Sequence, residues 1–119
     1  MLWHQLTDKN QLLEIISQSK KQPHENLAVL LFKHSTRCSI SSMALNRLQS
    51  KWVDNPKIPT YYLDLLSYRE ISNEIASLFQ VEHASPQVLV IKDGKCIYTA
   101  SHSEISVSDI MEVIAKQTL

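Results

Sequence analysis

Six consecutive apolar residues, Leu27 to Phe32, restrict the fold of this chain more than any other segment. An apolar run of strand length without a polar position suits a strand that is buried on both faces, in the middle of a sheet covered by helices. A polar turn follows, and a helical pattern begins at Cys38. We predict that this pattern is a helix closed by Asn55–Pro56, with an inward face made by Ile40, Met43, Ala44, Leu48 and Trp52.

Three further helices are predicted from caps and apolar spacing. They are expected from Asp8 to about Ser19 after a Thr7 cap, after a Ser67-x-x-Glu70 capping box, and after Ser106-x-x-Asp109.

Strands are predicted from short apolar or β-branched runs between turn residues. They are expected at Tyr61–Leu65, Gln87–Lys92 and Cys96–Ala100, and Trp3–Leu6 can add a short first strand. The dipeptide Asp93–Gly94 is a strong hairpin signal, so the last two strands should be antiparallel neighbours.

This order of elements predicts one α/β domain spanning residues 1–119. Right-handed crossovers between parallel strands, followed by a C-terminal hairpin and helix, give a central mixed β-sheet with helices on both faces. The arrangement is similar to the thioredoxin-like fold. Ligands of an open α/β sheet bind beyond the carboxyl ends of its strands, and Cys38 follows such an end.

Charge and composition exclude several classes of partner. The 119 residues carry 12 basic and 12 acidic side chains with no basic stripe, so we expect no nucleic-acid partner. The longest apolar run is too short to span a membrane, and the N-terminus lacks the features of a signal peptide. We therefore expect a cytoplasmic protein without a membrane partner, in which Cys38 and Cys96 are thiols at rest.

Cys38 is the predicted nucleophile. A helix N-terminus presents N–H groups without intrahelical partners and about half a positive charge, which favours the thiolate over the thiol. The surrounding sequence is His34-Ser35-Thr36-Arg37-Cys38-Ser39-Ile40-Ser41, a C-x-x-S arrangement with one thiol and an adjacent guanidinium. His34 either tunes the thiolate or is a hydrogen-bonded structural residue.

Neither a resolving disulfide nor a metal site is expected from the second cysteine and the histidines. Cys96 lies inside a predicted strand, and it would have to approach within ~7 Å of Cys38, between Cα atoms, to resolve a disulfide. No metal site is predicted, because the histidines show no ligand spacing: His4, His24, His34, His83 and His102.

The segment from Phe32 to Ala44 resembles the signature of the YtxJ-type monothiol bacilliredoxins, whose usual form is T-R-C-P-I-S. The leading Leu-Thr-containing helix, the Tyr-Leu-Asp strand and the Ser-Pro-Gln hairpin occur in the corresponding order, so the resemblance covers essentially the whole chain. Ser39 departs from the family, which commonly has proline there. Proline at the first helical position pre-sets φ, so serine should cost some rigidity.

The resemblance implies a redox function, removal of bacillithiol from protein mixed disulfides. Cys38 would attack the bacillithiol sulfur and become transiently bacillithiolated. Bacillithiol would be a co-substrate, no cofactor would be needed, and a second small thiol or a partner redoxin would discharge the intermediate. The implied substrate contacts are Arg37 to the malyl carboxylates and hydroxyl donors at Ser35, Thr36 and Ser41.

Ser85–Pro86 occupies the place where thioredoxin-like proteins carry a cis-proline facing the nucleophile. A cis bond is compatible with X-Pro, and it would turn the main-chain groups of Ser85 toward Cys38 and an incoming substrate. The alternative is that Pro86 merely starts an edge strand.

Two other functions remain open. The missing second thiol also suits a thioredoxin-like redox-sensing or binding module, in which Cys38 is modified without turnover. Some monothiol glutaredoxins carry iron-sulfur clusters, but those proteins usually have glycine and phenylalanine where this chain has Ser39-Ile40.

Overall fold

The computed structural model describes residues 1–20, 22 and 25–117, and their strands form one five-stranded sheet in the order β1-β3-β2-β4-β5. Parallel pairing joins β1 to β3 and β3 to β2, whereas β4 and β5 run antiparallel to their neighbours. The strands are β1 (Trp3–Gln5), β2 (Val29–His34), β3 (Thr60–Asp64), β4 (Gln87–Lys92) and β5 (Lys95–Ser101).

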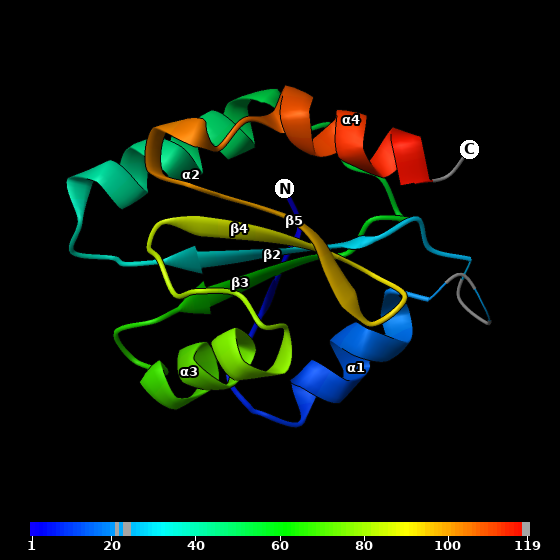
Figure 1. The fold of residues 1–119 in the computed structure, drawn as a ribbon. Helices are drawn as coiled ribbons and strands as arrows, with labels where there is room; N and C mark the ends of the chain where they lie inside the picture. The colour runs from blue at the N-terminus through cyan, green and yellow to red at the C-terminus, as the bar shows by residue number, and fades with distance from the viewer. Residues whose placement is uncertain (21, 23–24, 118–119) are drawn as a thin grey trace.

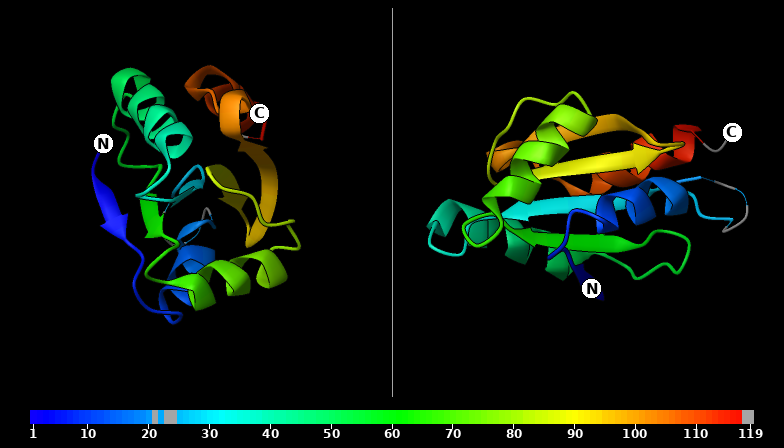
Figure 2. Two further views of the ribbon diagram at one scale, coloured as in Figure 1. Left: turned by 90° about the vertical axis from the view of Figure 1, so that its left-hand side faces the viewer. Right: turned by 90° about the horizontal axis from the view of Figure 1, so that it is seen from below.

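Two helices cover each face of this sheet (Figure 1). On one face lie α2 (Ser39–Lys51) and α4 (Val107–Gln117), and on the other lie α1 (Gln11–Gln18) and α3 (Arg69–Leu78). Figure 2 shows the two helix layers and the sheet between them from the end at which β2 finishes. The predicted mixed sheet with helices on both faces, a terminal hairpin and a last helix is confirmed.

The apolar run occupies the middle of the sheet, as predicted, and its side chains alternate between two cores. Leu30 and Phe32 pack under α2 and α4, whereas Val29 and Leu31 pack under α1 and α3. The strand runs from Val29 to His34 rather than from 27 to 32, because both neighbouring strands pair with Lys33 and β3 also pairs with His34. Both of these polar residues are buried.

Two predicted helix starts are wrong. Gln11 begins α1 and Asn10 is its capping residue, so Thr7 is not the cap; the Gln11 side-chain oxygen accepts the N–H groups of Thr7 and Asp8. Ser67 does not cap α3, because its hydroxyl donates to a carboxylate oxygen of Asp64 at 3.1 Å. The capping residue of α3 is Tyr68.

The predicted inward face of α2 is partly wrong. Ala44, Leu48 and Trp52 are buried, but Ile40 and Met43 are 53% and 61% exposed. The third helical residue, Ser41, points into the protein instead, and this fixes the rotation of the first turn. The helix also ends at Lys51, before Asn55–Pro56.

The hairpin and the last helix follow their sequence signals. Asp93 and Gly94 both adopt positive φ, 52° and 77°, as a tight type I′ turn requires. Their N–H groups donate to the carbonyl and hydroxyl oxygens of Ser19, which fastens the turn to the end of α1. The Ser106 hydroxyl accepts the N–H of Asp109 at 3.3 Å, as predicted for the start of α4.

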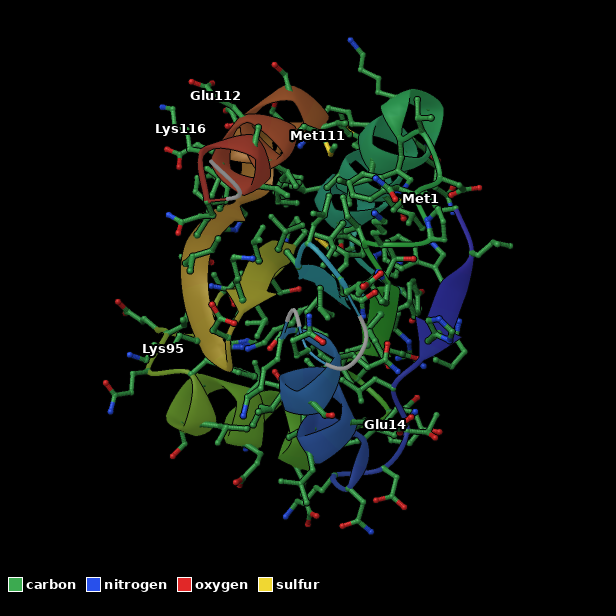
Figure 3. The ribbon with its side chains drawn as sticks, turned by 90° about the vertical axis from the view of Figure 1, so that its right-hand side faces the viewer. Met1, Glu14, Lys95, Met111, Glu112 and Lys116 are labelled. Carbon is green, nitrogen blue, oxygen red and sulfur yellow. The ribbon has the colours of Figure 1, made fainter. Side chains whose placement is uncertain are left out.

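Figure 3 shows the end of the molecule that carries this hairpin turn, opposite to the end of β2. Lys95 projects from the turn, and Glu112 and Lys116 form an exposed ion pair along α4. None of the helices in the described residues has the length and apolar character that a membrane crossing needs.

Candidate active site

Cys38 lies at the junction of a buried strand and a helix, as predicted. It is the capping residue before α2, with an extended backbone (φ −106°, ψ 122°). Its N–H donates to the Ser35 carbonyl at 3.1 Å, and its own carbonyl accepts the N–H of Ser42 at 3.0 Å. The thiol is free and half-buried. The four-residue turn therefore presents one partly accessible sulfur at the carboxyl end of β2.

A buried serine holds this turn from within. The Ser41 hydroxyl oxygen lies 2.7 Å from His34 Nδ1 and accepts the Ser35 N–H at 3.1 Å. Ser41 is fully buried, so its hydroxyl is occupied by the turn itself rather than open to a ligand. Ser41 therefore braces the turn of Cys38, and its hydroxyl is not placed for the predicted direct contact with a substrate.

His34 is built into the same brace. Its ring stacks on Phe32 with centroids 5.6 Å apart, and the Tyr62 ring lies 5.5 Å away. Burial lowers the pKa of His34, and the nearby Asp64 carboxylate acts in the opposite direction. A neutral imidazole suits its bond to Ser41, which favours the structural interpretation of His34 over direct tuning of the sulfur.

A polar pocket of about 380 Å³ opens at the turn that leads into Cys38. Its lining comes from two turns, Thr36 and Arg37 after β2, and Leu66 and Ser67 after β3. Asp64 shapes the second turn by accepting the Leu66 N–H and the Ser67 hydroxyl. Leu66 and Ser67 are not among the residues predicted for the site, although turns after adjacent parallel strands share one edge of a sheet and this rule pointed to them.

Ser85 and Pro86 also belong to this edge. The peptide bond between them is cis, as predicted. Gln87 pairs with Lys33, so Pro86 follows in register beside His34. The Ser85 hydroxyl is buried and has no hydrogen-bond partner among the described residues. The edge-strand alternative for Pro86 is wrong, because β4 lies between β2 and β5.

Cys96 lies at the other end of the sheet. It pairs with Ile91, which pairs with Val29 at the start of β2. The length of β2 thus separates it from the turn of Cys38, about 17 Å at the usual strand rise, far beyond the span of a disulfide. Burial raises the pKa of the Cys96 thiol, which donates to the Tyr98 carbonyl at 3.3 Å. These features support the structural interpretation of Cys96.

The described residues bring together no group of three or more histidine, cysteine or acidic side chains that could hold a metal ion. His24, one of the five histidines considered above, lies outside the described residues.

Several solved structures similar to this one are described as thioredoxins or as having a thioredoxin fold. One described as an oxidoreductase with a thioredoxin fold is 27% identical, with a TM-score of 0.73, and the match covers 92% of this chain and 90% of that chain. Thioredoxin from Malassezia sympodialis is 16% identical, with a TM-score of 0.70, over 99% and 92% of the two chains. Thioredoxin from Fasciola hepatica is 18% identical, with a TM-score of 0.69, over 96% and 98%.

The sequence also matches a family model described as monothiol bacilliredoxin BrxC over residues 4–110. This match spans the sheet, the turn of Cys38 and the hairpin, and together with the fold it supports a redox function. The chain belongs to the monothiol bacilliredoxin BrxC family.

Proposed function

We propose that this protein removes bacillithiol from protein mixed disulfides, with Cys38 as the attacking thiolate. The observation that carries the proposal is a single, partly accessible thiol at the start of α2, with a buried serine at the position three residues later. A chain of this family with that arrangement has the means for one exchange step and no neighbouring thiol for a second.

The exchange conserves atoms and electrons. The Cys38 thiolate attacks the bacillithiol sulfur of the mixed disulfide, so that the bond between the two substrate sulfurs breaks as a new disulfide to Cys38 forms. The client leaves as a thiolate and takes up a proton from solvent. A second bacillithiol thiolate then attacks the Cys38-bound bacillithiol, which restores Cys38 and releases bacillithiol disulfide. A partner redoxin is the other route of discharge, because Cys96 is too distant.

The pocket beside Cys38 suits the polar body of the small thiol. The Arg37 guanidinium can pair with the malyl carboxylates, and the Thr36 and Ser67 hydroxyls line the same space. At the same edge of the sheet, where Pro86 lies in register beside His34, Ser85 can offer its main-chain groups to a substrate. The Ser35 side chain is half-exposed and can contact a ligand, whereas the Ser35 N–H donates to the Ser41 hydroxyl oxygen. We infer a cytoplasmic setting, where such thiols stay reduced.

Turnover tests the proposal. The protein is mixed with a tenfold excess of a bacillithiolated test protein and free bacillithiol, and released client thiol is counted. We expect several equivalents of client thiol for each molecule of protein, and the same from Cys96→Ser. A plateau at one equivalent would instead support the redox-sensing or binding module, which the missing second thiol also favours.

A further inference from the structure

Lys33 is a buried cation that the exchange chemistry does not use. Its side chain is fully inaccessible, on the face of β2 covered by α3. The ammonium donates to the Ser72 carbonyl at 3.3 Å and lies 3.3 Å from His83 Nδ1. Neither partner is an acidic side chain, and none of the ion pairs found among the described residues involves Lys33.

We expect the buried Lys33 ammonium to lower the stability of the fold. Burial lowers the pKa of Lys33 to about 8, because the charged form is poorly solvated there. Buried charges can often be replaced by apolar side chains of similar volume with no loss, or with a gain, of stability. The bonds that the ammonium makes therefore point to a role other than stability.

The bond to His83 reaches the segment that leads into the active site. His83 belongs to the connection between α3 and β4, and its Nδ1 also lies 3.2 Å from the Ser72 hydroxyl. The Gln87 side chain holds the same connection by donating to the Glu82 carbonyl at 3.0 Å and accepting the Ala84 N–H at 3.4 Å. Residues 82–84 are thus fastened to the sheet from two sides, directly before Ser85–Pro86.

We propose that Lys33 is a positioning residue, which holds the 82–85 segment through His83 so that Ser85 is set against the substrate at Cys38. The inference rests on the proposed function for the identity of that substrate. Lys33 also directly precedes His34, so one strand end braces both sides of the site: His34 holds the turn of Cys38, and Lys33 holds the loop opposite.

The link should be sensitive to acid. The groups that act on His83 are Lys33 from β2, and Arg69 and the Ser72 hydroxyl from α3. Burial and then the two cations lower the pKa of His83, which favours the neutral ring. In a bond to the Lys33 ammonium, which can only donate, the unprotonated Nδ1 is the acceptor. Protonation places a hydrogen on Nδ1 facing the Lys33 ammonium. The 82–85 segment is therefore held in place at pH values above the ordinary histidine pKa, and this hold is lost as pH falls through the lowered pKa of His83.

Lys33→Met tests the role, because positioning and structural roles predict opposite results. We expect the urea midpoint of the variant to equal or exceed that of the wild type. We expect KM for a bacillithiolated test protein to rise about tenfold, which corresponds to the loss of one hydrogen bond to a charged group, with kcat changed less than twofold.

Lys92→Met is the matched control, since that strand lysine donates to the Leu27 carbonyl at the far end of the sheet and should leave KM unchanged. A lower urea midpoint with an unaltered KM would make Lys33 merely structural and overturn the inference.

His83→Asn, at an exposed position, keeps an acceptor near the place of Nδ1 but does not titrate. Its KM should stay within about twofold of wild type at pH 7.5, and it should rise less than the wild-type KM as pH falls below the ordinary histidine pKa. His4→Asn, on β1, should keep the wild-type pH profile. If His83→Asn also kept that profile, the inference would be wrong.

A readout without bacillithiol separates this inference from the proposed function. In Lys33→Met, the NMR titration of His83 should move to higher pH, and the Ala84 and Ser85 amides should exchange faster with solvent than in Lys92→Met. Unchanged titration and exchange would overturn the positioning role whatever disulfide the protein uses. Failure of the wild type to accept bacillithiol, with these shifts present, would remove only the proposed substrate.

Discussion

His34 Nδ1 lies 2.7 Å from the hydroxyl oxygen of Ser41, so the last residue of β2 is bonded directly to the first turn of α2. The same hydroxyl accepts the Ser35 N–H, and the turn that carries Cys38 is closed from inside by one side chain. In a dithiol redoxin, the residue three positions after the first cysteine is a second cysteine; in this chain that position is Ser41. Here a buried hydroxyl takes that place and is bonded to both His34 and Ser35 in the turn of Cys38.

Ser41→Ala should therefore lower the free energy of unfolding by about 1–3 kcal/mol, because it leaves a buried imidazole nitrogen and an amide without their partner. Urea denaturation measures the change. Ser42→Ala is the matched control at the next, exposed position, and it should stay within about 0.5 kcal/mol of wild type. Equal effects of the two substitutions would refute the brace.

Arg37→Gln should slow the reaction of Cys38 with a bacillithiol mixed disulfide roughly fivefold, because the pocket loses the cation that pairs with carboxylates. The comparison substrate is the same client protein bearing an uncharged mercaptoethanol disulfide, whose rate should change less than twofold. Stopped-flow measurement at two salt concentrations should show a salt dependence for the wild type that the variant lacks. A similar slowing with both substrates would argue against a role in recognising the anionic ligand.

Mild acid should destabilise the fold. Burial lowers the pKa values of His34 and His83, so the unfolded chain binds more protons than the native protein below about pH 6.5. Stability is full above that pH and is lost as pH falls toward the lowered native values. Urea unfolding at pH 7.5, 6.5 and 5.5 should show this decline, with a shallower slope in His83→Asn. A free energy of unfolding that is constant or rises on acidification would contradict these assignments.

The rotation of α2 gives a further prediction. Met43→Ser changes an exposed side chain and should leave the free energy of unfolding within about 0.5 kcal/mol of wild type. Leu48→Ala empties a buried position on the same helix and should cost about 2–5 kcal/mol. If Met43→Ser lowered the free energy of unfolding as much as Leu48→Ala, Met43 would belong to the buried face of α2, as the sequence pattern predicted.

Short patterns of adjacent residues were enough to predict most of the fold and the position of Cys38 at the candidate site. The apolar run predicted the central strand, Asp93–Gly94 predicted the hairpin, and Cys38 stands where strand and helix patterns meet. Each of these signals is contained in a few adjacent residues. The resemblance then supplied the cis bond before Pro86, which no periodicity indicates.

Features that depend on packing between distant segments were not predictable. Lys33 and His83 are 50 positions apart, and their bond depends on how α3 lies over β2. The Leu66–Ser67 side of the pocket depends on β3 lying next to β2, and only the general rule that turns after adjacent parallel strands share one sheet edge pointed to it. The outward turn of Ile40 and Met43 follows from the burial of a polar residue, Ser41, which a pattern of apolar residues does not register.

Intact-mass spectrometry of wild type, Cys38→Ser and Cys96→Ser, each mixed with a bacillithiolated test protein, tests the central claim most directly. We predict one bacillithiol adduct on wild type and on Cys96→Ser, none on Cys38→Ser, and an equal amount of released client. No adduct on any of the three proteins, or an adduct on wild type that disappears only in Cys96→Ser, would contradict the account.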